Sequence, residues 1–537
     1  MLCKIIFQSR MLVHFFKQIR NGGLGVTTNN FSSACFVNKS DLKRMIEVKE
    51  HVWTIQTARR QISTRMDKQQ QTPRIDSYFC LNDYDAYGFD LDHTLAKYKL
   101  VNVFNLSYDS ISNYLVNEHG YDARIQHDLH KYKDFIAKGL VLDIERGNIL
   151  KLGAQGEILM AKHGTKPISK DKLIDIYGND LMFEHSKTIL KTVKNNNKDY
   201  RFFENYFDIP GLVAMARIVD ILDEKGGSDS KKHSYLETWS DIMKALMNTY
   251  TYEAFRLGTG GFFPGIKKNP GNYVEKCSDD VKTWLKKLKE NNKCVFLVTS
   301  SYIDFSSLLL ETIIGKDWKS YFDISVFRAR KPAFFTDGHP FLRINDDNIE
   351  KEPVQDLKKD GCYSQGNHKE LQTFIANITN KKHPKVVYFG DNICADCFPS
   401  KNYADWATVL LLEEMDAEGY LCSDGTVPGH ENDGEPSKKR SKFEHSSFVT
   451  PEEVEYLLTE EWGPFLYHDI KEDKSINNGS RVMNTFWGSV IAKYSCIAIP
   501  SLEYIAGVPL SHKFQKFTTE EGNTKGFHPG IPSSLLP

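Results

Sequence analysis

Asp90 directly follows the aromatic and apolar run Tyr87–Phe89, and Asp92 lies two residues further on. This spacing of two acids suggests catalysis. Acids at positions i and i+2 of a tight loop can take different roles: one attacks phosphorus, and the other exchanges a proton with the leaving oxygen. Asp-x-Asp is common in surface turns, but Asp-x-Asp-x-Thr after an apolar strand, here ending at Thr94, is a stronger signal. The pair therefore predicts phosphoryl-transfer chemistry.

Two later segments could hold phosphate oxygens. Thr299 and Ser300 follow the apolar run Cys294–Val298, and a hydroxyl with adjacent backbone N–H groups at a strand-to-helix turn suits a phosphate. A helix N-cap by Thr299 or Ser301 is the alternative interpretation. Lys331, which precedes a proline and two phenylalanines, could neutralise both the phosphate and the attacking carboxylate.

A third acidic segment follows the apolar run Val386–Phe389. It reads Gly-Asp-Asn-Ile-Cys-Ala-Asp, and its aspartates are Asp391 and Asp396. Glycine lets the chain turn sharply, and carboxylate oxygens can bind Mg²⁺ directly or support it through the waters that this ion keeps. An acidic helix cap is the alternative interpretation. The segment predicts a magnesium site beside the first aspartate pair.

The elements that position these residues are short apolar strands alternating with helices. The strands are expected at Tyr87–Leu91, Cys294–Val298, Val386–Phe389 and Thr408–Leu412, and an amphipathic helix at Asp279–Glu290 precedes the second. Continuous apolar strands in such an alternation are typical of buried parallel sheets. The fold class is therefore predicted to be α/β, with a Rossmann-like doubly wound parallel sheet whose carboxyl edge carries the site.

The predicted domain limits follow from the spacing of these strands. About 200 residues separate the first two strands, which is far more than a crossover needs, so this stretch is predicted to be a large inserted α+β cap. From the N-terminus, the predicted parts of the chain are an extension that is disordered or transit-like (1–80), a first core segment (81–100) and the cap (101–278). They continue with a second core segment (279–415), a mobile low-complexity loop (416–447) and a C-terminal extension that packs on the core (448–537).

In this order, the four motifs resemble those of the haloacid-dehalogenase-like superfamily, and the resemblance spans Tyr87–Leu412. More specifically, the chain resembles the cytosolic purine 5′-nucleotidase family. The residues that carry this second resemblance are Gly88–Leu95, Gly139–Asp143, Gly147–Lys151, His163-Gly164, Pro210, Arg217–Asp220 and Arg330–Phe335. The match therefore includes the inserted region, which stands where that family has its cap.

The resemblance implies a role for each motif residue. Asp90 is expected to be the nucleophile and Asp92 the general acid and base. Mg²⁺ would be held by Asp90, the backbone carbonyl of Asp92 and Asp391, with Asp396 assisting through water or from just outside the ligand set. Thr299, with Ser300 beside it, and Lys331 would hold the phosphoryl oxygens. The implied substrate class is nucleoside 5′-monophosphates.

A candidate substrate cleft lies in the inserted region at His163, Thr165 and Lys166. The family's base-holding segment after His-Gly here lacks an aromatic residue, which argues against purine specificity. His93 is expected either to shape the leaving-group side or to be a packed or solvated histidine of its loop. The aromatic cluster from Phe202 to Phe207 is interpreted as cap core rather than as a base-stacking platform.

Composition narrows the class of partner and the compartment. The 537 residues carry a formal net charge of −1, and no apolar run approaches the length of a membrane helix, so neither nucleic acid nor membrane is expected as a partner. Ten scattered cysteines suggest reduced thiols. Cytosol is the favoured compartment. Mitochondrion is the alternative, because residues 1–40 are basic and contain no acid.

The predicted function is a Mg²⁺-dependent phosphomonoester hydrolase that works through an aspartyl-phosphate, with a 5′-nucleotidase activity on nucleoside monophosphates. A nucleoside phosphotransferase would need the same residues and stays an alternative. A weakly active ligand-binding or scaffold protein is the non-enzymatic alternative, and the intact set of motif residues argues against it. By resemblance, the chain could also form a homo-oligomer.

Overall fold

A computed structural model of the chain describes residues 78–418 except 194, 196 and 227–233, together with 456–457, 459–469, 482–520 and 523–525. The basic, acid-free segment 1–40 lies outside the described residues, as does the N-terminal extension up to residue 77. Of the loop predicted at 416–447, only the first three residues are described.

A nine-stranded central sheet forms the core. Its strands are, in spatial order, β11 (Glu350–Pro353), β10 (Phe341–Ile344), β12 (Gly361–Gln365), β9 (Ile324–Phe327), β8 (Cys294–Val298), β2 (Ala86–Phe89), β13 (Val386–Gly390), β14 (Ala407–Leu411) and β17 (Ile497–Ile499). The seven strands from β12 to β17 are parallel. The predicted α/β class with a mostly parallel sheet is confirmed.

One edge of the sheet departs from the all-parallel prediction. β10 pairs antiparallel with β12, and β11 pairs antiparallel with β10. These two strands alternate buried and exposed side chains or are largely exposed, unlike the fully buried inner strands. Their sequences therefore lack the continuous apolar run that revealed the parallel strands.

The order of the inner strands explains how the motifs meet. β2 lies between β8 and β13, with Phe89 opposite Leu297 on one side and Phe389 on the other. Because all three strands run in parallel, Asp90, Thr299 and Asp391 follow them at the same edge of the sheet.

Helices cover both faces of the sheet: α10 (Asp279–Glu290), α11 (Ile303–Ile313), α12 (Ala333–Thr336), α13 (His368–Thr379), α14 (Phe398–Ala404) and α15 (Glu414–Ala417). α10 begins after Ser278, whose side chain accepts a hydrogen bond from the N–H of Val281. Trp284 of α10 packs edge-on against Phe89 and Phe389 of the neighbouring strands. Such aromatic burial stabilises the sheet beyond its hydrogen bonds.

A second, five-stranded antiparallel sheet lies between β2 and β8 in the chain. Its strands are, in spatial order, β6 (Lys166–Pro167), β5 (Ile158–His163), β4 (Asn148–Leu152), β3 (Val141–Asp143) and β7 (Tyr200–Phe202). The helices of this region are α3 (Leu100–His119), α4 (Lys170–Tyr177), α5 (Ser186–Thr192), α6 (Ile209–Glu224), α7 (Tyr235–Thr249), α8 (Tyr252–Leu257) and α9 (Phe262–Lys268).

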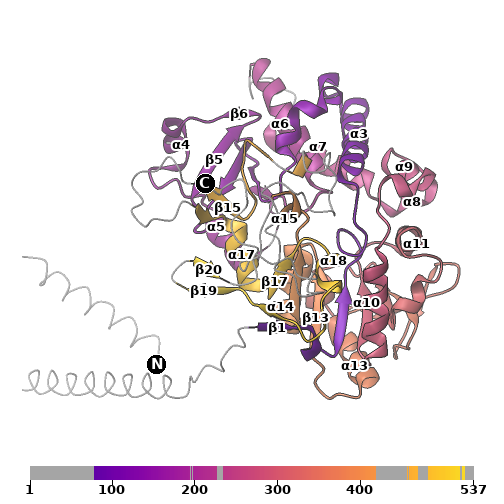
Figure 1. Cartoon of the computed structure of the whole chain (residues 1–537). Coiled ribbons are helices and arrows are strands. Elements are labelled where there is room, and N and C mark those ends of the chain that lie inside the picture. Colours follow the sequence, from indigo (N-terminus) through magenta and orange to yellow (C-terminus); the bar gives the residue numbers. More distant parts are fainter. Residues whose placement is uncertain are drawn as a thin grey trace, which may run out of the picture. The chain divides into compact units, whose positions relative to one another are not determined.

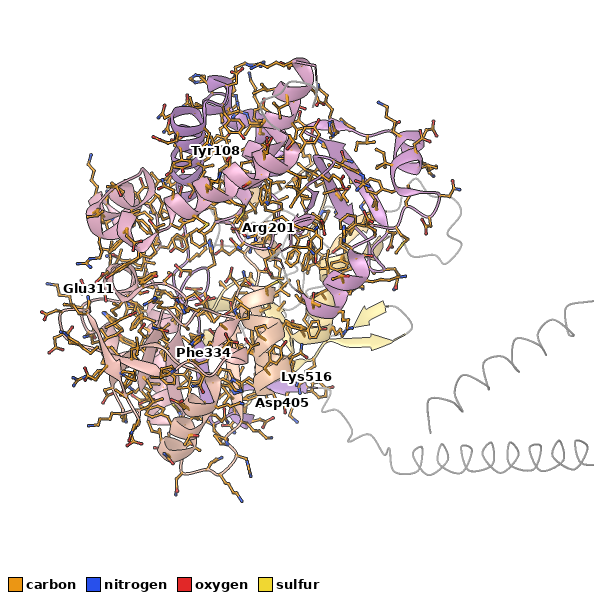
Figure 2. All side chains as sticks on the ribbon, turned by 180° about the vertical axis from the view of Figure 1, so that it is seen from behind. Tyr108, Arg201, Glu311, Phe334, Asp405 and Lys516 are labelled. Carbon is orange, nitrogen blue, oxygen red and sulfur yellow. The ribbon has the colours of Figure 1, made fainter. Side chains whose placement is uncertain are left out.

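This inserted region and the central sheet occupy opposite halves of Figure 1, where α3, α6 and α7 gather away from α10 and α13. In Figure 2, Tyr108 of α3 lies among the helices of the insertion, whereas Phe334 of α12 lies in the half that holds the central sheet. We call residues 101–278 the cap; these limits stay a prediction.

The described C-terminal residues contact both halves. β17 adds the last strand of the central sheet, while Trp487 of α17 (Phe486–Tyr494) donates from Nε1 to the carbonyl of Gly139 in the cap at 2.8 Å. The remaining described α-helix is α18 (Glu503–Ala506). The remaining described strands pair as β1 (Tyr78–Cys80) with β18 (Lys513–Gln515), β15 (Tyr467–Asp469) with β16 (Val482–Asn484), and β19 (Thr518–Glu520) with β20 (Asn523–Lys525). Among the described helices, none has the length and apolarity to cross a bilayer.

Candidate active site

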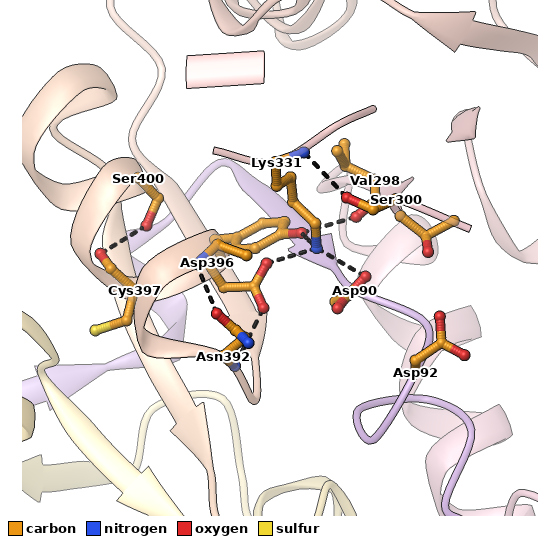
Figure 3. Close-up of polar contacts among 12 residues, drawn as sticks. Asp90, Asp92, Val298, Ser300, Lys331, Asn392, Asp396, Cys397 and Ser400 are labelled. Atoms are coloured by element: carbon orange, nitrogen blue, oxygen red, sulfur yellow. Dashed lines mark hydrogen bonds and ion pairs between the residues drawn. The ribbon is translucent and has the colours of Figure 1, made fainter. Parts of the chain in front are cut away.

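A buried ion-pair cluster occupies the carboxyl edge of the central strands. Lys331 Nζ lies 2.8 Å from Asp90 Oδ1 and 2.5 Å from Asp396 Oδ1. It also donates to the hydroxyl of Tyr388 at 3.0 Å. Figure 3 shows the lysine extended between the two carboxylates, with Asp92 to one side. The structure thus brings together the residues predicted at three separate motifs.

The shape of the loop after β13 depends on Gly390, the last residue of that strand. A Cβ on Gly390 would lie 2.6 Å from the side chain of Asp396, so only glycine allows this carboxylate to fold back against the strand. Asn392 then accepts a hydrogen bond from the N–H of Ala395 at 2.7 Å and starts the π-helical turn Ile393–Cys397. Such single π turns often occur at functional sites.

Three carboxylates in the site could hold a metal ion. Asp90, Asp391 and Asp396 are all buried, and one oxygen of each lies within 4.8 Å of the other two. Hard carboxylate oxygens are the donors that Mg²⁺ prefers, so this donor set fits the predicted ion. Asp90 and Asp396 both pair with Lys331, so the ion pairs do not decide which of them would be a direct ligand, and the assisting role of Asp396 stays a prediction.

The electrostatics of the cluster follow from its burial. Burial raises the pKa of Asp90 to about 7, with the charges of Asp396 and Asp92 acting in the same direction and Lys331 opposing them. Burial likewise raises the pKa of Asp391 well above its usual range. Burial lowers the pKa of Lys331, but the carboxylates of Asp396 and Asp90 outweigh it and raise that pKa overall. The buried carboxylates can therefore all be ionised at the same time only with a cation beside them.

Asp92 is held by two hydroxyl groups from different regions of the chain. Tyr98 donates to Oδ1 and Ser301 donates to Oδ2, each at 2.6 Å. The alternative of an N-cap by Ser301 or Thr299 is wrong, because α11 is capped at Tyr302 without a side-chain hydrogen bond. Ser301 instead orients the predicted acid, and both carboxylate oxygens of Asp92 have a donor.

The predicted phosphate-binding residues lie around the same edge. Thr299 is fully buried, and its hydroxyl accepts a hydrogen bond from the N–H of Ser301 at 3.1 Å. Ser300 is exposed, and its hydroxyl accepts from the backbone N–H of Lys331 at 3.0 Å. The strand-to-helix turn after β8 is therefore joined directly to the loop that carries the lysine.

The three residues predicted to form a substrate cleft lie elsewhere. His163 pairs with Asp223 at 2.9 Å between its Nε2 and Oδ2. Thr165 hydrogen-bonds Asp220, and Lys166 is exposed on β6. None of the three lines the cavity that opens onto Asp90.

That cavity has a volume of about 360 Å³ and has a polar and an aromatic side. The polar side carries the motif residues, and the aromatic side carries Phe207, Tyr250, Tyr252, Phe255, Phe262, Phe263, Tyr302 and Phe305. Of the aromatic cluster 202–207, Phe202, Phe203 and Tyr206 are buried as predicted for cap core. Phe207 differs, because it is half-buried and faces the cavity.

His93 lines the cavity and is also packed in its loop. Its Nδ1 lies 3.2 Å from Glu413 Oε1, and its ring contacts Tyr98 and Phe207 at centroid distances of 4.7 and 5.0 Å. The packing of His93 in its loop is confirmed, and its role on the leaving-group side stays a prediction.

Several residues that support the site were missed in the sequence. Tyr388 sits inside an apolar strand, and Tyr98 lies six residues after Asp92 with no motif around it. Glu204 of the cap accepts a hydrogen bond from the N–H of Cys394 at 3.0 Å, and Lys138 pairs with Glu414 at 3.2 Å. A polar residue within an apolar or aromatic run is the only signal that could have indicated them.

Comparison with known proteins agrees with this geometry. A model of the 5′ nucleotidase family matches residues 77–432. The chain belongs to the 5′ nucleotidase family. It is 37% identical to 5′-nucleotidase domain-containing protein 1 of Homo sapiens over 461 residues, which cover 85% of this chain and 97% of that protein.

Other similar proteins match a smaller share of the chain. Identity to 5′-nucleotidase domain-containing protein 2 of Homo sapiens is 25% over 346 residues, or 63% of this chain and 62% of that protein. A solved haloacid dehalogenase-like hydrolase from Bacteroides fragilis is 14% identical and covers 61% of this chain and 87% of its own, with a TM-score of 0.22, too low to support an inference. Family membership places the chain among hydrolases of phosphoric monoesters.

Proposed function

We propose that this protein is a Mg²⁺-dependent 5′-nucleotidase that hydrolyses nucleoside monophosphates through an aspartyl-phosphate on Asp90. The observation that carries the proposal is the cluster in which Lys331 contacts both Asp90 and Asp396 beside Asp391. This arrangement collects one cation and three carboxylates at the carboxyl edge of a parallel sheet, where α/β proteins bind ligands.

Each residue then has a task in the reaction. Asp90 attacks phosphorus in line with the departing ribose oxygen, and a bond forms between its carboxylate oxygen and phosphorus as the ester bond breaks. Lys331 offsets the repulsion between the carboxylate and the phosphoryl oxygens. Asp92 gives a proton to the departing oxygen and later takes one from the water that hydrolyses the aspartyl-phosphate.

A bound Mg²⁺ would add positive charge at the phosphoryl group, held by Asp90, Asp391 and the backbone carbonyl of Asp92. Tyr98 and Ser301 fix the carboxylate of Asp92 from both sides, so that its position does not depend on the substrate. Thr299, which directly follows β8 and lines the cavity, would bind a phosphoryl oxygen.

The test is phosphate release from nucleoside 5′-monophosphates with Mg²⁺ and with EDTA, for the wild type and Asp90→Asn. Release is expected only with Mg²⁺, and loss of the nucleophile is expected to lower kcat by several orders of magnitude. The Asp90→Asn variant keeps the size of the side chain, so its circular dichroism should match the wild type. Equal release by the variant, or release that EDTA does not affect, would contradict the proposal.

A further inference from the structure

His93 has a backbone conformation that is unusual for a residue with a side chain. Its φ is +51°, in the left-handed region, where the Cβ of an L-residue comes too close to the following carbonyl oxygen. Such a conformation persists only where the surrounding structure holds it. His93 directly follows Asp92, and the peptide between them carries the carbonyl that is expected to bind Mg²⁺. The groups that hold His93 therefore bear on the metal site.

The direction of the Asp92 carbonyl depends on the φ of His93. The peptide between the two residues is a rigid plane that turns about the bonds on either side of it, so the ψ of Asp92 and the φ of His93 change together. A turn of this plane by about half a revolution would bring His93 to a negative φ and relieve its strain. The same turn would point the carbonyl of Asp92 the opposite way. The left-handed conformation of His93 thus keeps this carbonyl on its present side.

One polar contact orients the side chain of His93. Nδ1 lies 3.2 Å from Glu413 Oε1, whereas Nε2 has no hydrogen-bond partner among the described residues. His93 is 3% exposed and Glu413 is 6% exposed. The other neighbours of the imidazole are the rings of Tyr98, Tyr206 and Phe207, which fill space around it but do not select the direction of a nitrogen. Glu413 is therefore the group that fixes how the imidazole lies.

Glu413 reaches His93 from another part of the central sheet. Burial acts to raise the pKa of Glu413, but the hydrogen bond from His93 and the charges of His93, Lys138 and Lys97 outweigh it and lower that pKa overall. An ionised carboxylate only accepts, so Nδ1 of His93 carries the proton. β14 precedes Glu413 and β2 precedes the catalytic loop, and the two strands lie on opposite sides of β13. The contact thus joins the two loops that flank the end of β13.

The residue after Glu413 ties the same segment to the cap. Glu414 Oε1 accepts a hydrogen bond from the hydroxyl of Tyr206 at 2.8 Å and lies 3.2 Å from Lys138 Nζ. That ammonium group also lies over the ring of Tyr206, 4.5 Å from its centroid. Tyr206 in turn contacts the imidazole of His93 at a centroid distance of 5.6 Å. Glu413 is therefore held on both sides by buried neighbours and is a fixed anchor for His93.

We propose that Glu413 is a positioning residue of the metal site: through Nδ1 of His93 it holds the Asp92–His93 peptide in the orientation that the Mg²⁺-binding carbonyl of Asp92 requires. In this role Glu413 acts only through His93. The inference rests on the proposed function and deepens it, because it adds to the site a residue from outside the four motifs.

The experiment measures Mg²⁺ binding without substrate, by isothermal titration calorimetry, for the wild type, Glu413→Met and Glu413→Gln. Methionine fills the space of the glutamate but offers Nδ1–H only a weak acceptor, whereas glutamine keeps an amide oxygen there. The Kd for Mg²⁺ is expected to rise about tenfold in Glu413→Met, since the left-handed conformation of a non-glycine residue costs about this factor in population. Glu413→Gln is expected to stay within about twofold of the wild type.

A kinetic readout and a matched control accompany the titration. The Mg²⁺ concentration that gives half-maximal phosphate release should rise in Glu413→Met by the same factor as the Kd. Glu311→Met, at an exposed position of α11, makes the same substitution away from the site and should bind Mg²⁺ like the wild type. A misfolded fraction would lower the number of binding sites but not their affinity. Wild-type affinity in Glu413→Met, or equal weakening in Glu413→Gln, would overturn the inference.

A double-mutant cycle with His93→Gly separates this role from a general loss of packing. Glycine adopts a positive φ without strain, so a loop with glycine at this position no longer needs Glu413. Adding Glu413→Met to His93→Gly is therefore expected to change the Kd for Mg²⁺ by less than about twofold. A general loosening of the fold would weaken binding equally in both backgrounds, and that result would overturn the inference.

Mg²⁺ binding needs no phosphate transfer, so the inference and the proposed function can fail separately. If the wild type binds Mg²⁺ but releases no phosphate, and Glu413→Met still binds about tenfold more weakly, the proposed function fails and the inference stands. If phosphate release depends on Mg²⁺ but Glu413→Met binds the ion as tightly as the wild type, the inference fails alone. A wild type that binds no Mg²⁺ would overturn both.

Discussion

Glu204 offers the clearest test of how the cap and the catalytic loop depend on each other. This cap residue is 4% exposed, and its carboxylate accepts a hydrogen bond from the N–H of Cys394, two residues before Asp396. Burial raises its pKa from the ordinary 4.5 to about 7, despite the opposing hydrogen bonds from Cys394. The folded protein therefore keeps a proton on Glu204 at pH values where the unfolded chain releases it.

The sign and size of the effect follow from proton linkage. Because the folded state binds more protons, the stability of the wild type falls as pH rises from 4.5 to about 7. Each pKa unit corresponds to about 1.4 kcal/mol, so the full loss is about 3 kcal/mol. Glutamine cannot ionise, and its amide oxygen can still accept from Cys394. Glu204→Gln is therefore expected to be more stable than the wild type by about 1 kcal/mol at pH 5 and about 3 kcal/mol at pH 8.

The assay is urea denaturation of both proteins at several pH values in EDTA, so that protons are the only titrating ligand. Glu253→Gln, at an exposed position of α8, is the matched control and should follow the wild type at every pH. A free-energy difference between Glu204→Gln and the wild type that stays constant from pH 5 to pH 8 would refute the reasoning, because it would mean that Glu204 ionises alike in both states.

Three further predictions concern the site and the sheet below it. Lys331→Met leaves two buried carboxylates without their cation, so we expect loss of phosphate release and about 3–5 kcal/mol of destabilisation in urea denaturation. The double variant, in which Asp396→Asn is added, should regain stability but not activity. Tyr98→Phe removes one donor to Asp92 and should lower kcat about tenfold with KM nearly unchanged, as steady-state kinetics would show; an unchanged kcat would argue against the positioning role. Gly88→Ala would place a Cβ 2.3 Å from a ring on β8 and should cost about 1–3 kcal/mol in thermal or urea denaturation, and wild-type stability would contradict this.

The sequence was sufficient to locate the candidate active site at the carboxyl edge of the sheet, because each motif directly follows an apolar strand. Each of β2, β8 and β13 is a continuous apolar run, and each motif begins within two residues of its end. Parallel strands then bring such ends together without further information. The amphipathic helix predicted at Asp279–Glu290 has those limits in the structure, because Ser278 caps it and its apolar spacing is regular.

The residues that sequence reasoning misplaced depend on tertiary contacts. Thr165 follows the family's His-Gly pair, but its hydroxyl turns to Asp220 of α6 instead of the cavity. Ser301 looked like a helix cap, yet the chain continues to Tyr302 before α11 starts, which frees the serine for Asp92. The aromatic side of the cavity comes from three stretches of the chain, at Phe207, at 250–263 and at 302–305, which only the fold brings together.

The cap and the core are joined close to the chemistry, which bears on how substrate reaches Asp90. Glu204 holds the catalytic loop at Cys394, and Lys138 of the cap is buried against Glu414 just beyond β14. The C-terminal residues add a third connection, because Lys151 donates to the carbonyls of Trp462 and Pro464 at 2.6 and 2.9 Å, and β17 of the same segment completes the central sheet.

A swing of the whole cap away from the core would break these hydrogen bonds and separate the buried charges of Lys138 and Glu414, at a cost of several kcal/mol for that pair. Cap and core also meet at the aromatic side of the cavity, where Tyr252 stacks on Tyr302 at 4.4 Å and Phe263 contacts Phe305 at 5.2 Å. Opening of the cap would therefore break aromatic packing as well as these polar contacts.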